Sequence, residues 1–169
     1  MKKMLKYLLP LLLLFAMTGT PVRAENLNKA RLNALIQEIR GDENVEVVDI
    51  GSFGMKMMRT AARAAAKTPE DREVLRFLKG VKGIKVVNFE GMEEKDRIRF
   101  AARVEKVLAG QEKLMEAKSD GKKVDIYAST DEKGEAFRDV IMFDGDGALI
   151  CLFGTIPFGL IENMVGENK

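Results

Sequence analysis

The chain has 169 residues, with 28 basic and 26 acidic side chains, one cysteine and no histidine. Without histidine it lacks Ser-His-Asp and Cys-His nucleophile activation and the usual zinc ligands, and no GxxxxGK[ST] or GxGxxG phosphate-binding loop is present. We therefore expect a protein that is not an enzyme and that uses no metal or cofactor.

Residues 1–24 have the three-part pattern of a cleavable signal peptide. Three lysines within the first six residues precede an apolar block over residues 7–17, and Val22-Arg23-Ala24 predicts cleavage before Glu25. A membrane anchor is the alternative, but the block is about half as long as the ~20 residues that span a bilayer. No cysteine lies at the predicted cleavage site, where a lipoprotein would carry its lipid, so we expect a periplasmic or secreted protein and not a lipoprotein.

Cleavage would leave residues 25–169, with 24 basic and 26 acidic side chains. This balance gives no reason to expect binding to nucleic acid. No repeat, low-complexity tract or linker interrupts these residues, and no second apolar block long enough to span a membrane follows the leader. We therefore predict a single domain.

The first predicted elements are a helix, a strand and two further helices. They span residues 26–40, 45–50, 55–67 and 68–79. Asn26 is the expected cap of the first helix and Gly41 its stop, while Thr68, followed by proline and two acidic residues, is the expected cap of the third.

The second half begins with a strand at 84–89, after a turn flanked by Gly80 and Gly83. A long helix is expected over 93–111, with Phe100, Val104, Val107 and Leu108 on its inner side, and a further turn through Leu114 and Met115. Three strands joined by glycine-containing turns follow, and Pro157 begins a short helix that can fold back over the sheet. These last four elements are predicted at 123–129, 137–144, 148–156 and 158–165.

Helical connections between the first three strands and tight turns between the last three predict an α+β fold. The expected sheet is mixed and five-stranded, with two helical crossovers and then an antiparallel meander, and helices pack against it. Residues 149–153 are all apolar, as in a strand covered on both faces or at the sheet centre. Within them Cys151 is expected to be a buried core residue, the alternatives being an intermolecular disulfide or a reactive thiol.

The alanine-rich helix carries a candidate binding site. Its basic residues recur at steps of three and four and form a stripe: Lys56, Arg59, Arg63 and Lys67. Such a stripe is either a solvated surface or a site for an anionic partner, which would be an acidic protein surface or lipid headgroups. The nearby Met55, Met57 and Met58 are expected to fill the core rather than to bind Cu(I).

Two acidic groupings are candidates for chemistry. A glycosidase-like hydrolase needs two facing carboxylates, but Asp139 and Asp144 are an odd number of residues apart and face opposite sides of a regular strand unless a bulge intervenes. The segment 144–147, Asp-Gly-Asp-Gly, fits a hairpin turn better than a calcium loop because apolar residues follow where oxygen ligands are needed.

The pattern resembles the family of small exported Bacteroidetes proteins catalogued as domain of unknown function 4252. The resemblance rests on Leu35-Ile36 in the first helix, the strand 45–50, the basic alanine-rich helix, and the segments 83–87, 123–127, 137–142 and 152–156. It implies no catalytic residue or cofactor. It implies a link to envelope signalling, because genes of such proteins often lie near extracytoplasmic sigma-factor systems.

The sequence therefore favours a non-catalytic exported domain of the cell envelope that binds a protein or an anionic partner. One alternative is a small-ligand or lipid carrier with a pocket between the sheet and the helices. A more remote one is a carboxylate-based hydrolase.

Overall fold

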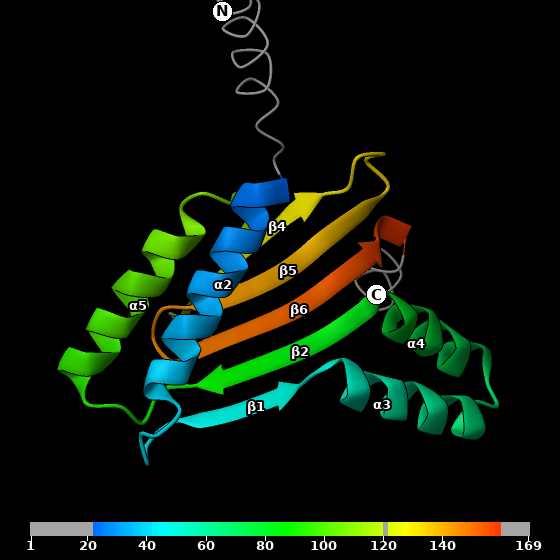
Figure 1. Ribbon diagram of the computed structural model, residues 1–169, viewed down its shortest axis with the longest axis horizontal. Coiled ribbons are helices and arrows are strands. Elements are labelled where there is room, and N and C mark those ends of the chain that lie inside the picture. The colour runs from blue at the N-terminus through cyan, green and yellow to red at the C-terminus, as the bar shows by residue number, and fades with distance from the viewer. Residues whose placement is uncertain (1–21, 120–121, 160–169) are drawn as a thin grey trace, which may run out of the picture.

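The computed structural model describes residues 22–119 and 122–159 and shows one sheet with helices on both faces (Figure 1). The helices are α2 (Val22–Ile39), α3 (Ser52–Ala65), α4 (Pro69–Gly80) and α5 (Glu94–Leu108). The strands are β1 (Glu46–Ile50), β2 (Val81–Asn88), β3 (Glu112–Ser119), β4 (Lys122–Thr130), β5 (Ala136–Asp144) and β6 (Ala148–Pro157). In this part of the chain no helix is both long and apolar enough to cross a bilayer.

The strand order is β1-β2-β6-β5-β4-β3, and each neighbouring pair is antiparallel. The α+β class is confirmed, but the predicted mixed sheet of five strands is wrong. The apolar strand β6 lies between β2 and β5 inside the sheet, and Cys151 on it is buried, as expected.

The sixth strand, β3, replaces the helical turn that was predicted through Leu114 and Met115. Its sequence, EKLMEAKS, consists largely of residues that favour helices. It pairs with β4 along its whole length, so the backbone hydrogen bonds of the sheet edge override local propensity.

The direction of β2 follows from the connection that precedes it. When a single helix connects two strands, it returns the chain to the end of the sheet at which the first strand began, and the next strand is then parallel to the first. Between β1 and β2 there are two antiparallel helices of similar length, α3 and α4, whose displacements cancel. The chain therefore re-enters the sheet at the end at which β1 stopped, and β2 runs antiparallel to β1.

One face of the sheet is covered by α2 and α5, which lie side by side across it (Figure 1). Apolar side chains of the two helices fill the space above the strands, with Phe89 between the rings of Phe100 and Phe143. From α2 these core residues are Leu32, Leu35 and Ile36, and from α5 they are Phe100, Ala101, Val104 and Leu108. The inner side predicted for the long helix is confirmed.

The opposite face carries a smaller core under α3 and α4. Met55 of α3 and Leu78 of α4 pack there against strand residues, among them Val81 and Ile156. Gly80, the last residue of α4, leads directly into β2 without the predicted turn. A Cβ atom at Gly80 would collide with the backbone carbonyl oxygen of Thr155, so this junction requires glycine.

The predicted start of α4 and the predicted hairpin turns are confirmed. Thr68 and Asp71 form a capping box on α4, and the hairpin turns at 131–135 and 145–147 join β4, β5 and β6. The predicted cap at Asn26 is wrong, because α2 already begins at Val22. The signal peptide falls almost entirely, and the last helix mostly, outside the described residues.

Candidate functional site

The predicted basic stripe is divided by the structure. Lys56, Arg59 and Arg63 lie on α3, but Lys67 follows the end of that helix. Lys56, Arg63 and Lys67 are exposed, whereas Arg59 is half-buried. The four residues do not form one continuous solvent-facing row.

Arg59 has a structural contact that the sequence did not reveal. Its Nη1 atom lies 3.4 Å from the carbonyl oxygens of Leu78 and Val81, to which it donates hydrogen bonds. A cation beside the last carbonyl groups of a helix offsets their partial negative charge. Arg59 therefore joins α3 to the end of α4.

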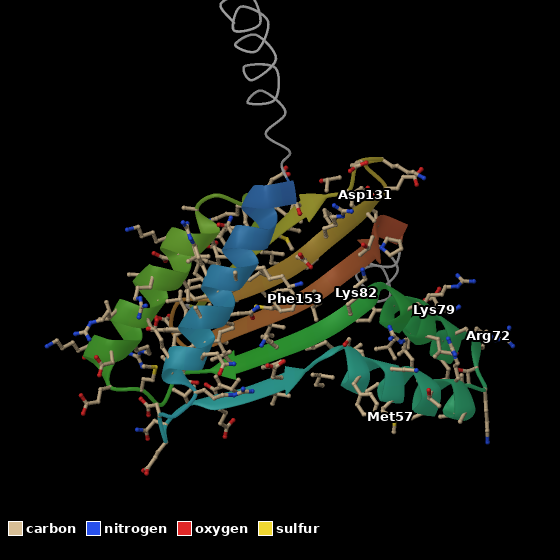
Figure 2. All side chains as sticks on the ribbon, in the orientation of Figure 1. Met57, Arg72, Lys79, Lys82, Asp131 and Phe153 are labelled. Carbon is tan, nitrogen blue, oxygen red and sulfur yellow. The ribbon has the colours of Figure 1, made fainter. Side chains whose placement is uncertain are left out.

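Further cations missed by the stripe lie on α4 and at the start of β2. Arg72, Arg76 and Lys79 recur at steps of four and three on α4, and they are exposed, as is Lys82. Figure 2 shows Arg72 and Lys79 extending away from the sheet. We call residues 52–82, which comprise α3, α4 and the first residues of β2, the basic hairpin.

Charge is strongly segregated into the basic hairpin. It holds eight basic and three acidic residues, and Asp71 among the latter is occupied in the capping box. The rest of residues 25–169 has 16 basic and 23 acidic residues. The net charge of residues 25–169 is therefore close to zero although the basic hairpin is positively charged and the rest of these residues is negatively charged.

Exposed apolar side chains lie on the outer side of α3 beside its cations. Phe53 is 76% exposed and Met57, one turn later, is 60% exposed, whereas Met55 between them is fully buried. Figure 2 shows Met57 at the rim of α3. Met55 fills the core as expected, but that expectation is wrong for Met57 and for Met58, which is 39% exposed.

A groove lies between α2 and α5, on the side of these helices away from the sheet. Its volume is about 530 Å³, and Arg31, Ala34, Leu35, Glu38, Arg103, Lys106 and Val107 line it. Arg103 makes two hydrogen bonds with the Glu38 carboxylate, at 2.6 and 3.0 Å, and they lower the pKa of Glu38. Between these helices and the sheet, the described side chains form the larger core.

The structure does not bring Asp139 and Asp144 together. A bulge does interrupt β5, but it lies at Asp139 itself, and the strand is regular from Val140 to Asp144. Asp139 Oδ1 accepts a hydrogen bond from Gly154 N and lies 4.0 Å from Lys29 Nζ, while Asp144 Oδ1 accepts one from Asp146 N in the hairpin turn. Each carboxylate is engaged in local structure.

A polar cluster at the β3–β4 end of the sheet was also missed. Asp125 is buried, and its Oδ2 atom lies 3.0 Å from Lys113 Nζ and 3.6 Å from Lys123 Nζ. The hydrogen bond with Asp125 raises the pKa of Lys113, and burial raises the pKa of the neighbouring Tyr127. The contacts of Asp125 with Lys113 and Lys123 join β3 to β4 at the edge of the sheet.

No group of three metal-binding side chains was found among the residues that the structure describes. Burial raises the pKa of the Cys151 thiol to about 12, so the thiol is far less reactive than a free cysteine.

A family model described as "Domain of unknown function (DUF4252)" matches residues 38–161. The match extends from the end of α2 through the whole sheet and includes the basic hairpin. No curated protein and no solved structure shows a significant match to the chain.

Proposed function

The chain belongs to the DUF4252 family, whose name assigns no activity, and we propose that it is an exported, non-catalytic domain that binds an anionic membrane surface of the cell envelope through the basic hairpin. The observation that carries this proposal is the joint presence, on α3, of exposed apolar side chains and cations without any acidic residue.

Two neighbouring rows run along the outer side of α3. Phe53, Met57 and Ala61 follow one another at steps of four, and Lys56 and Arg63 lie seven residues apart beside them, so that both sets keep their side of the helix. A helix with this division can lie in the plane of a bilayer surface, with its apolar side chains below the headgroups and its cations among the phosphates.

The magnitudes indicate that both rows are needed. Burying a phenylalanine or methionine side chain contributes about 1.5–3 kcal/mol, and each cation beside an anionic leaflet contributes about 1 kcal/mol. Two apolar side chains alone would give weak binding, and so would two or three cations. Together with the exposed cations of α4, they are sufficient for micromolar binding that weakens in salt.

An acidic protein surface is the competing partner. Cations alone would serve it, and it would not require phenylalanine and methionine to remain exposed in the free protein. Phe53 and Met57 therefore favour lipid over an acidic protein.

The test is co-sedimentation of the chain that begins at Glu25 with vesicles of phosphatidylglycerol and phosphatidylcholine, compared with vesicles of phosphatidylcholine alone. We expect binding to the anionic vesicles, a loss of at least about tenfold in Lys56→Glu/Arg63→Glu, and a comparable loss in Phe53→Ser/Met57→Ser. Arg59 is left unchanged because its hydrogen bonds hold α4.

The matched control is Lys95→Glu/Arg99→Glu, which also replaces one lysine and one arginine with glutamate. Both residues are exposed on α5, on the other side of the sheet. This variant should bind anionic vesicles nearly as well as the unchanged chain. If the α5 control loses as much vesicle binding as Lys56→Glu/Arg63→Glu, the net charge of the chain and not the basic hairpin drives binding. An absence of vesicle binding, together with hairpin-dependent crosslinking to an acidic protein, would replace the lipid with a protein partner.

The groove between α2 and α5 supports a second candidate function, the binding of a small anionic ligand. Three cations, Arg31, Arg103 and Lys106, surround its apolar floor, and Arg103 among them is paired with Glu38. A thermal-shift screen with small organic anions tests this, because a ligand at 100 times its Kd stabilises the folded state by about 2.7 kcal/mol. A shift that persists in Lys106→Glu would place the ligand elsewhere.

A further inference from the structure

β3 forms one edge of the sheet and presents the backbone of its outer side to solvent. Among the described elements, β4 alone contacts β3 extensively, so the outward N–H and C=O groups of β3 face no other described strand. A bulge interrupts the pairing between Lys113 and Met115, and the strand is regular from Met115 to Ser119. This regular segment is about 17 Å long and can accept another strand.

Two exposed side chains of opposite charge lie on the regular segment. They are Glu116 and Lys118, and the register with β4 places them opposite Asp125 and Lys123. Asp125 lies two residues before Tyr127, which belongs to the core under α2 and α5. Because side chains two residues apart in a strand share a face, Glu116 and Lys118 both project on the face that carries these helices.

Lys118 has an unfavourable electrostatic environment within its own chain. It lies directly opposite Lys123, and like charges in this position destabilise a strand pair. Lys123 is compensated, because its Nζ atom lies 3.2 Å from Glu116 Oε2 and 3.6 Å from Asp125 Oδ2. Lys118 makes no ion pair with any residue that the structure describes. An acidic group that approached from the outer side of β3 would supply the missing partner.

A second copy of β3 carries such a group at the correct place. If two copies pair antiparallel about a two-fold axis at Ala117, Glu116 of each copy lies opposite Lys118 of the other, and both pairs lie on the same face. A register centred on Glu116 would instead place two glutamates opposite each other, and one centred on Lys118 would oppose two lysines. Charge therefore selects one register.

The other edge strand does not have this self-complementarity. The charged residues of β1 are Glu46 and Asp49, which are both acidic, so two copies of β1 would repel each other. β1 is also shorter than β3, and α3 contacts it. The two edges therefore differ, and only β3 has the charge pattern for pairing with itself.

We propose that two copies of the chain associate by antiparallel pairing of their β3 strands, centred on Ala117. The two six-stranded sheets would then form one sheet of twelve strands. A contact of five residues on each side buries less than the 1,200 Å² or so of a stable interface, so we expect a weak dimer, with a Kd of about 10–500 µM. This inference concerns another surface than the basic hairpin and does not depend on membrane binding.

Sedimentation velocity of the chain that begins at Glu25, over a range of concentrations around the expected Kd, tests the proposal. Lys118→Glu and Glu116→Lys should each weaken the dimer by about tenfold, because each places like charges opposite each other at the two contacts. Lys118→Glu leaves the ion pairs of Glu116 with Lys113 and Lys123 in place, so its loss of association cannot come from those contacts.

The sharpest result is expected when the two single variants are mixed. In a mixed dimer, each position of one copy again faces the opposite charge on the other, so association should return to nearly the level of the unchanged chain. The double variant Glu116→Lys/Lys118→Glu should also dimerise by itself. A chain that stays monomeric, assemblies larger than a dimer, or no recovery in the mixture would overturn the proposed pairing.

A cysteine at the two-fold axis gives a second readout. Residue 117 would lie opposite residue 117 of the other copy with about 4.5–5.5 Å between the Cα atoms, within the range that a disulfide bridges. Ala117→Cys should therefore form a disulfide-linked dimer much faster than the control Ala102→Cys, an exposed position on α5. Equal rates of dimer formation in the two variants would overturn the proposal.

Discussion

The Asp139 carboxylate accepts a hydrogen bond from the backbone N–H of Gly154, with 2.8 Å between Asp139 Oδ1 and Gly154 N. Asp139 stands at the bulge of β5 with a φ of 48°, a left-handed conformation that aspartate and asparagine tolerate better than most residues. Gly154 also has a positive φ, of 134°. The pair thus holds two irregular backbone positions in neighbouring strands.

We expect Asp139→Val to lower the free energy of unfolding by about 2–4 kcal/mol, because it removes the acceptor and places a β-branched residue at positive φ. Asp139→Asn keeps an acceptor and the conformational tolerance, and should cost about 1 kcal/mol or less. Urea unfolding measures both. Equal losses would show that neither the acceptor nor the backbone conformation determines stability at this position.

Arg59 and Lys56 should behave differently although both are cations of α3. Arg59→Ala removes the hydrogen bonds to the carbonyl oxygens of Leu78 and Val81 and should destabilise the fold by about 1 kcal/mol. Lys56→Ala, at an exposed position, should change stability by no more than about 0.5 kcal/mol. Thermal unfolding of both variants checks this, and a larger effect at Lys56 would contradict the assignment of structural and surface roles.

Asp131 should contribute to loss of stability in acid. Its Oδ1 atom accepts hydrogen bonds from the backbone N–H groups of Glu135 and Ala136, the first at 2.8 Å, and these bonds hold its pKa below the usual value of 3.8. The contribution is complete above the unfolded-state pKa, and it is lost as the pH falls through the lower folded-state pKa.

Asp131→Asn should therefore flatten the decline of the urea midpoint between about pH 5 and pH 2. The exposed neighbour Glu132 is a control in the same turn, and Glu132→Gln should leave this decline nearly unchanged. If Asp131→Asn shows the same decline as the unchanged chain, these hydrogen bonds do not link folding to pH.

Cys151 should be inert in the folded protein. With a pKa of about 12 its thiolate is scarce at pH 8, and the side chain is fully buried. A thiol reagent should modify it only as fast as the protein unfolds, and rapidly in denaturant. Fast modification of the native protein, or isolation as a disulfide-linked dimer, would favour the alternatives of a reactive or paired thiol.

Much of the secondary structure and part of the candidate site could be predicted from the sequence. The start of α4 was predictable because Thr68 caps a residue only three positions away. The hairpin at 145–147 was predictable because its glycines lie within the turn that they allow. The cations of α4 recur at steps of four and three and can be recognised from the sequence by the same spacing as those of α3.

β3 could not be predicted in this way. Leu114 and Met115 lie among glutamate, lysine and alanine, which favour a helix, and the strand exists because β4 offers unpaired backbone groups at its edge. The same applies to the direction of β2, which depends on the break between α3 and α4 and on how the two helices pack.

The sequence by itself determined the features that depend on near neighbours along the chain: the turns, the cap of α4, the inner side of α5 and the cations of α3. Only the tertiary structure decided which of those cations is engaged, since Arg59 meets carbonyl oxygens 19 and 22 residues away. It also decided which apolar side chains share a face of the sheet, because alternation within one strand defines two faces, but only the register between strands places Val48 and Met115 on the same one.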